Sequence, residues 1–104
     1  MATGDGPKGY WIAHVRVTDP ERYKDYVAAN AKAFEKYGGR FLVRGGSNEV
    51  RHGDLPFDRH VVLEFDSYAT ARACYDSPEY KAAETIRNEA SDGYVVVIEG
   101  WQGS

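Results

Sequence analysis

The chain has 104 residues, of which 42% are hydrophobic and 28% charged, and its formal net charge is -3. This length fits one domain, and the mild negative charge provides no basic surface for nucleic acid, so nucleic-acid binding is not expected. No apolar run approaches the roughly 18 residues of a membrane helix, so no membrane association is expected either. The single cysteine, Cys74, allows no intrachain disulfide, which suits a reducing cytoplasm.

Two segments are expected along the chain. Residues 1–9 lack the positive start and apolar run of a signal peptide and are expected to form a flexible lead-in. Residues 10–104 are expected to form one domain. Eight Tyr, four Phe and two Trp are a large aromatic load for this length. Some of these rings are therefore expected to pack against a second subunit.

The first predicted strand runs from Tyr10 to Val17, and its side chains alternate between a wholly apolar face and a mixed face. Residues 18–21, Thr-Asp-Pro-Glu, then start a helix, because Thr or Asp can cap the free amides and Pro suits the first helical position. Apolar residues recur at helical spacing as far as Tyr37. The pair Gly38-Gly39 ends this helix, since glycine adopts the left-handed conformation common at helix ends.

The second predicted strand is Arg40–Arg44. Residues 45–48, Gly-Gly-Ser-Asn, are expected to interrupt it as a bulge or turn, and residues 49–52 are expected to resume it. The third strand is predicted over residues 59–66 by its alternating apolar pattern.

Residues 67–90 contain two helix starts ten residues apart, at Ser67 and Ser77. Pro78 lacks the amide of a continuous helix and disfavours helical geometry in the residue before it. The pattern therefore predicts two helical pieces, residues 67–75 and 78–90. Residues 91–93 are expected to form a turn, and the fourth strand is predicted over residues 94–100.

The resulting order, βαββαβ, predicts an α+β ferredoxin-like fold, in which a four-stranded antiparallel sheet carries all helices on one face. The first and third strands are expected side by side and parallel, with the second and fourth at the edges. The free face is expected to carry Ile12, Leu42 and Val62 together with His14, Arg44, His60 and Glu64. Because this face is half apolar, it is expected to pack against its copy in a homodimer.

A family resemblance is carried by residues 10–13, by residues 17–21 with Tyr23 and Tyr26, and by residues 37–46 and 64–80. Together these motifs resemble the bacterial domain-of-unknown-function family 1330, over nearly all of residues 10–100. The resemblance implies membership of the dimeric α/β-barrel superfamily of ferredoxin-like folds. That superfamily is similar in fold to haem-degrading monooxygenases, cofactor-free quinone-forming monooxygenases, lactone isomerases and chlorite dismutase. This chain departs from the family pattern at Cys74, where a Trp is usual, and at residues 51–53, where Leu-Glu-Gly is usual.

His14 and Glu64 are the candidate catalytic pair, because a histidine near a carboxylate can act as a general base that its partner holds in place. The alternative is a polar pair that fixes the register of the dimer. Arg44 is a candidate ligand-binding residue, since its guanidinium forks toward oxyanions, and the alternative for it is a salt bridge to Glu64. His60 is a further candidate for ligand binding, or else a partly solvated histidine near the strand end.

Tyr26, Tyr75 and Tyr80 are candidate hydrogen-bond donors to a ligand between the helices and the sheet, although aromatic rings at helical spacing are more often core. Cys74 is expected to be buried and inert. The spacing of the three histidines suits no tight metal site, so no metal is expected. No organic cofactor is expected either, while haem, which needs one axial histidine, is left open.

Two functions are therefore expected as alternatives. One is the binding of a small metabolite between sheet and helices or between subunits, with cofactor-independent proton transfer of an isomerase or monooxygenase type. The other is a non-catalytic accessory or stress-related dimer without an enzymatic site. The first requires an open cavity beside the His14–Glu64 pair.

Overall fold

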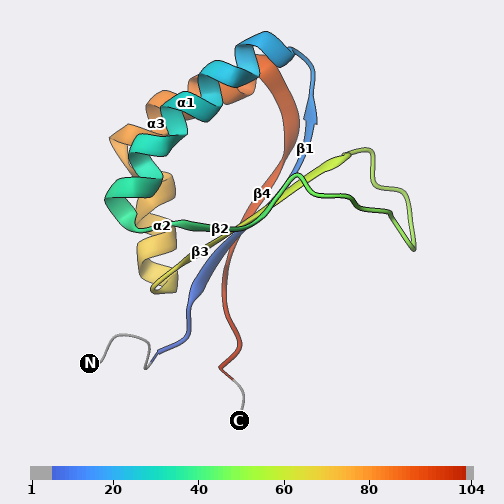
Figure 1. Ribbon diagram of the computed structural model, residues 1–104. Helices are drawn as coiled ribbons and strands as arrows, with labels where there is room; N and C mark the ends of the chain where they lie inside the picture. The colour runs from blue at the N-terminus through green and yellow to red at the C-terminus, as the bar shows by residue number, and fades with distance from the viewer. Residues whose placement is uncertain (1–5, 103–104) are drawn as a thin grey trace.

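The computed structural model describes residues 6–102 as a sheet whose one face is covered by helices (Figure 1). The elements are β1 (Gly9–Val17), α1 (Pro20–Tyr37), β2 (Arg40–Arg44), β3 (Arg59–Phe65), α2 (Tyr68–Asp76), α3 (Pro78–Ala90) and β4 (Ser91–Glu99). This is the predicted α+β ferredoxin-like order, with the second helical region in two pieces. Residues 1–5 of the expected lead-in lie outside the described residues, and Gly9 already belongs to β1.

The strands lie in the order β2-β3-β1-β4, and each neighbouring pair is antiparallel. The expectation that β1 and β3 run parallel is therefore wrong. The crossover through α1 makes β1 parallel to β2, and the connection from β2 to β3 then reverses the direction of the chain. The central strands consequently run in opposite directions, with Tyr10 opposite Glu64 and His14 opposite His60.

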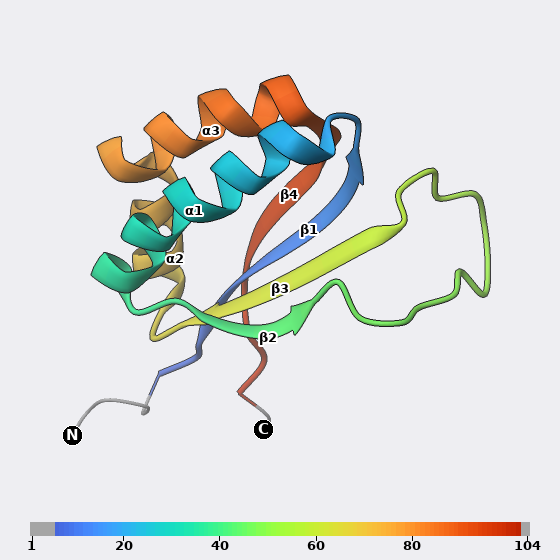
Figure 2. The same cartoon turned by 45° about the horizontal axis from the view of Figure 1, so that its top comes forward.

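Two further expectations about local structure are wrong. Residues 91–93 start β4 instead of forming a turn, because β1 is long enough for Arg16 to pair with Asp92 and for Val17 to pair with Ser91. Residues 45–58 contain no helix or strand, so the strand does not resume at residues 49–52. Figures 1 and 2 show this segment extending beyond the sheet, away from the helices.

The break between α2 and α3 is confirmed, and Ser77 is the residue that organises it. Its Oγ accepts a hydrogen bond from the backbone amide of Tyr80 and donates one to the carbonyl of Cys74 at 2.7 Å. Ser77 is buried and takes an extended backbone conformation with ψ of 151°. One hydroxyl therefore caps α3 and satisfies the end of α2 at the same time.

Helices α1 and α3 lie side by side across one face of the sheet (Figure 2). An aromatic core lies beneath them: Trp11 contacts Phe34, Phe65 and Tyr80 with ring centroids 4.8–5.5 Å apart. Cys74 is also fully buried, as expected, and burial raises the pKa of its thiol to about 12, which disfavours the reactive thiolate. Among residues 6–102 no helix is both long enough and apolar enough to cross a membrane.

Candidate functional site

The free face of the sheet holds Glu64 between two partners. The Tyr10 hydroxyl donates to Glu64 Oε2 at 2.9 Å, and Arg40 Nη2 donates to Oε1 at 3.0 Å. The pKa of the Glu64 carboxyl is lowered, most strongly by the hydrogen bond from Tyr10 and next by the hydrogen bond from Arg40. The hydrogen bond to Glu64 in turn raises the pKa of the Tyr10 hydroxyl. Glu64 is therefore a carboxylate held in a fixed position, and its oxygens are already engaged.

The two candidate histidines on this face form a separate chain of hydrogen bonds. Nδ1 of His14 lies 2.9 Å from Nδ1 of His60, and Nε2 of His60 lies 3.1 Å from Oδ1 of Asn48. The Asn48 amide nitrogen donates to the carbonyls of Gly46 and Asp58, so its oxygen is the acceptor for His60. A neutral His60 therefore accepts at Nδ1, and His14 donates to it.

The structure does not bring His14 and Glu64 together. They share a face, but His14 pairs with His60 and Glu64 pairs with Tyr10, so the two lie four positions apart, about 13 Å along the strand. Each is hydrogen-bonded to a different set of partners. The geometry therefore does not support the predicted arrangement, in which Glu64 would hold His14 in place as a general base.

The lowered pKa of Glu64 gives a testable dependence on pH. Because the pKa lies below its ordinary value, the ionised carboxylate stabilises the fold at neutral pH, and this contribution is lost as pH falls through the folded-state pKa. We expect Glu64→Gln to lower the free energy of unfolding by no more than about 1 kcal/mol at pH 7. Urea unfolding at several pH values should show this difference shrinking below pH ~4.5.

A matched control is Glu49→Gln, because Glu49 forms an exposed pair with Arg51 outside the sheet. We expect almost no change there at any pH. A wild-type advantage over Glu64→Gln that grows as the pH falls would contradict this account of Glu64.

The predicted position of Arg44 is wrong. The register between β2 and β3 shifts between Phe41 and Val43, so that Arg44 pairs with the core-facing Val61. A bulge of one residue moves every later side chain to the opposite face. Arg44 therefore lies on the helix side, and the salt bridge to Glu64 is made by Arg40 instead.

A pocket opens on that helix side, between the sheet and helices α1 and α3. Its empty volume is about 490 Å³, including solvent at its open side, which is an upper bound on the space for a ligand. Most of its lining is apolar, with Trp11 and Leu63 from the sheet and Phe34 and Val27 from α1. The predicted residues Tyr26, Tyr80 and Arg44 also line it. Tyr75, by contrast, is not among the lining residues.

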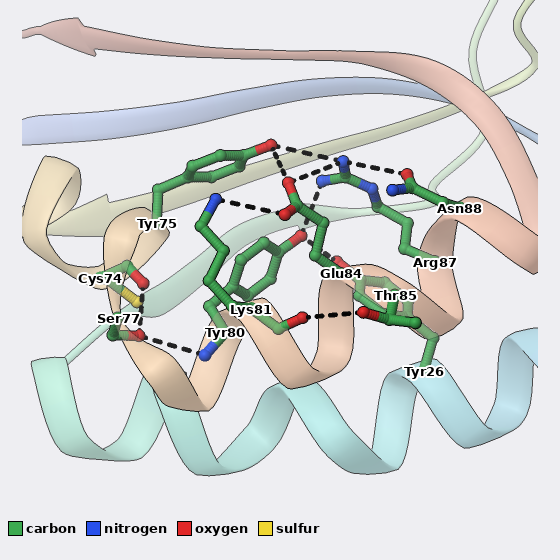
Figure 3. A network of polar contacts seen from close by, with 10 residues as sticks. All are labelled: Tyr26, Cys74, Tyr75, Ser77, Tyr80, Lys81, Glu84, Thr85, Arg87 and Asn88. Carbon is green, nitrogen blue, oxygen red and sulfur yellow. Dashed lines mark hydrogen bonds and ion pairs between the residues drawn. The ribbon is translucent and has the colours of Figure 1, made fainter.

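The polar part of the pocket belongs to a hydrogen-bond network between α1 and α3 (Figure 3). The hydroxyls of Tyr26 and Tyr80 lie 2.8 Å apart, and Arg87 Nη1 donates to the Tyr80 oxygen at 2.9 Å. The Arg87 guanidinium also donates hydrogen bonds to the hydroxyl of Tyr75 and to the carboxylate of Glu84. Tyr75 itself donates to Glu84 at 2.7 Å. A charged group thus polarises a chain of hydroxyls that reaches the pocket wall.

Burial raises the pKa of both tyrosines that line the pocket, Tyr26 and Tyr80. Both therefore stay protonated at neutral pH and act as hydrogen-bond donors or acceptors, not as bases. No histidine, aspartate or glutamate is among the described residues that line the pocket. The arrangement can hold an oxygen with partial negative charge, but it supplies no proton acceptor of its own.

Sequence reasoning missed three of the polar pocket residues: Asn30, Arg59 and Arg87. Arg87 lies in the predicted helical piece 78–90 and is partly buried, and an arginine removed from water needs acceptors. Arg59 opens β3 opposite Val15, which puts it on the core-facing side of the sheet. Alternation from Val61 would have placed it there.

No group of three or more potential metal-ligating side chains is found among the described residues. The three histidines also differ in their freedom to bind a haem iron. His14 and His60 bond to each other, while His52 lies in the exposed segment between β2 and β3. An axial role for His14 or His60 would thus require breaking an existing hydrogen bond.

The fold and the pocket define a ferredoxin-like α+β protein with an aromatic, partly polar cavity beneath its helices. Residues 8–101 match the family described as Domain of unknown function (DUF1330), and the chain belongs to this family. None of the curated proteins compared with it matches.

Solved structures share the fold at low sequence identity. RPA0582 from Rhodopseudomonas palustris, of unknown function, is 20% identical with a TM-score of 0.76, covering 94% of this chain and 85% of that one. SnoaB from Streptomyces nogalater, a cofactor-independent oxygenase, is 16% identical with a TM-score of 0.60, covering 93% and 96%. A dimeric ferredoxin-like protein of unknown function from Thermobifida fusca is 22% identical with a TM-score of 0.60, covering 90% and 92%.

Proposed function

We propose that the pocket between the sheet and helices α1 and α3 binds a small metabolite with an apolar, mainly aromatic body and an oxygen of partial negative charge. The observation that carries this proposal is the chain from Arg87 through Tyr80 to Tyr26, which brings polarised hydroxyls to a mostly apolar cavity. Small-molecule sites commonly combine apolar walls with a few placed polar groups.

A chemical role for this site is the second part of the proposal. Hydroxyls polarised by Arg87 would stabilise the enolate left when a proton leaves the carbon beside a ligand carbonyl. This chemistry needs no metal or organic cofactor, as in an isomerase or a cofactor-independent oxygenase. No carboxylate or histidine is among the described lining residues. The proton would therefore pass to another group of the ligand itself or to solvent. The likeness to SnoaB is one of fold and adds only analogy.

The alternative is an accessory dimer without an enzymatic site. It is favoured by the free face of the sheet, where each predicted catalytic residue is already hydrogen-bonded to other side chains: Glu64 to Tyr10 and Arg40, and His14 to His60. In this alternative His14, His60 and Glu64 set the geometry of the interface.

The proposal includes a homodimer formed through the free face of the sheet. Tyr94 is 65% exposed, Val96 48% and Ile98 46%, and these β4 residues continue the apolar stripe of Ile12 and Val62. An apolar sheet face of this kind is poorly suited to water and is covered by symmetric pairing. Solved relatives of the same fold are described as dimeric. We also propose a cytoplasmic location, which the single free cysteine, Cys74, suits.

The test is a thermal-shift screen of aromatic metabolites on the wild type and on Val27→Phe, which narrows the pocket. A ligand at a hundredfold its dissociation constant should stabilise the wild type by about 2.7 kcal/mol, and we expect Val27→Phe to abolish the shift. Val50→Phe makes the same change in the exposed segment and should leave it intact. A shift that survives Val27→Phe but is lost in His14→Ala would place the ligand on the free face and overturn the proposal.

A further inference from the structure

Two arginines stand on the core-facing side of the sheet, at the rim of the pocket. Arg44 is turned there by the bulge in β2, and Arg59 by its place opposite Val15 at the start of β3. Both line the pocket, and Arg44 is exposed while Arg59 is partly buried. The pocket therefore has one polar wall at the Tyr26–Tyr80 pair and a second at this pair of guanidinium groups.

Neither guanidinium has an acceptor among residues 6–102. Arg16, Arg22, Arg40, Arg51 and Arg87 each contact a carboxylate. Arg59 Nε, by contrast, is shut off from solvent without any hydrogen-bond partner. A buried donor without an acceptor is costly, and more so when it belongs to a charged group. A ligand oxyanion beside the guanidinium would offset part of this cost through its charge.

Both side chains are held by aromatic rings and not by charges. The Arg44 guanidinium carbon lies 4.1 Å from the ring centre of Phe41, and that of Arg59 lies 5.7 Å from Tyr23. Gly45 leaves room for Arg59, since a Cβ at that position would collide with its Nη1. Stacking fixes the plane of a guanidinium while leaving its N–H groups free for a planar anion such as a carboxylate.

We propose that the ligand is an aromatic carboxylate whose carboxylate binds Arg44 and Arg59 at the rim, with a phenolic or carbonyl oxygen at its far end directed to Tyr26 and Tyr80. This assignment rests on the proposed function, because it uses the same pocket and adds the chemical class of its ligand. The mostly aromatic interior accepts the ring, while the unpaired charges of Arg44 and Arg59 select the acid over neutral analogues.

The experiment compares 4-hydroxyphenylacetate and 6-hydroxy-2-naphthoate with their primary amides by isothermal titration calorimetry on the full chain. The acid of at least one pair should bind at least about tenfold more tightly than its amide, because it gains charge-assisted hydrogen bonds. Arg44→Gln and Arg59→Gln should each weaken acid binding and leave amide binding unchanged. Arg59→Lys should retain part of the preference, since it keeps the charge but not the fork.

Arg72→Gln is the matched control, because Arg72 is exposed and lies over Tyr68, away from the pocket lining. It should change neither affinity. Arg44 is exposed, so Arg44→Gln keeps the test sound if Arg59→Gln lowers the melting temperature. Equal binding of acid and amide, lost together in Val27→Phe, would overturn this assignment while leaving the proposed function standing. Acid binding that survives both substitutions overturns it too, and absence of all binding at millimolar concentration overturns both.

Discussion

Replacing Trp11 with alanine is expected to lower the free energy of unfolding by about 3–5 kcal/mol. Trp11 is 2% exposed and lies at the centre of the aromatic core, where Phe34, Phe65 and Tyr80 surround its ring. Its Nε1 also donates to the carbonyl of Ala71 at 2.8 Å, which ties α2 to β1. The substitution removes this bond and leaves a cavity that these packed rings can close only in part. Urea unfolding followed by circular dichroism, at one protein concentration, measures the loss.

Trp101 provides the control, because it is 89% exposed at the end of the chain. Trp101→Ala should cost less than about 0.5 kcal/mol. Trp11→Phe should fall between the two, since it keeps an aromatic ring but leaves the Ala71 carbonyl without its donor. A loss below about 1 kcal/mol for Trp11→Ala, the size of an average substitution, would contradict a central role of this ring in the core.

Those parts of the fold that depend only on residues close together in the sequence could be predicted from it. Ser67 and Ser77 each cap a helix as expected, because capping needs only a side-chain oxygen and the amide three residues on. The wholly apolar face predicted for the first strand likewise lies in the core, where Trp11 is buried. The predicted direction of β3 was wrong. This direction depends on how the chain reverses after β2, and the fourteen residues that make the reversal contain no helix or strand.

The candidate site was harder to predict, because it depends on register and on contacts between helices. One bulge in β2 turned Arg44 away from Glu64, and nothing in the local residue pattern specifies that bulge. Tyr26 and Tyr80 were named from the sequence, but their contact arises from the packing of α1 on α3. His14 and Glu64 were placed on the correct face, yet the pairing register separates them. Alternation along a strand determines the sheet face on which a side chain lies, whereas its contact partners depend on the pairing register of the whole sheet.

Changing Val62 to aspartate is expected to raise the dissociation constant of the proposed homodimer by about a thousandfold or more. Val62 lies on the free face of the sheet, next to Ile12 and between the Glu64 and His60 clusters. In a symmetric dimer the new carboxylate is buried once in each subunit without a cation to pair with, and each desolvation costs several kcal/mol. The fold itself should persist, because Val62 faces away from the core beneath the helices. Sedimentation velocity over a range of concentrations measures the change, and circular dichroism checks the fold.

Ala82→Asp adds the same charge on the exposed side of α3, in the opposite layer, and should leave the dimer intact. The comparison separates the effect of burial at the interface from the effect of a more negative net charge. A monomeric wild type at micromolar concentration, or a Val62→Asp variant whose dissociation constant stays within tenfold of the wild type, would refute pairing through this face. The half-apolar stripe over β4, β1 and β3 would then need another cover, and the paired histidines and the Tyr10–Glu64–Arg40 cluster could no longer be assigned to a dimer interface.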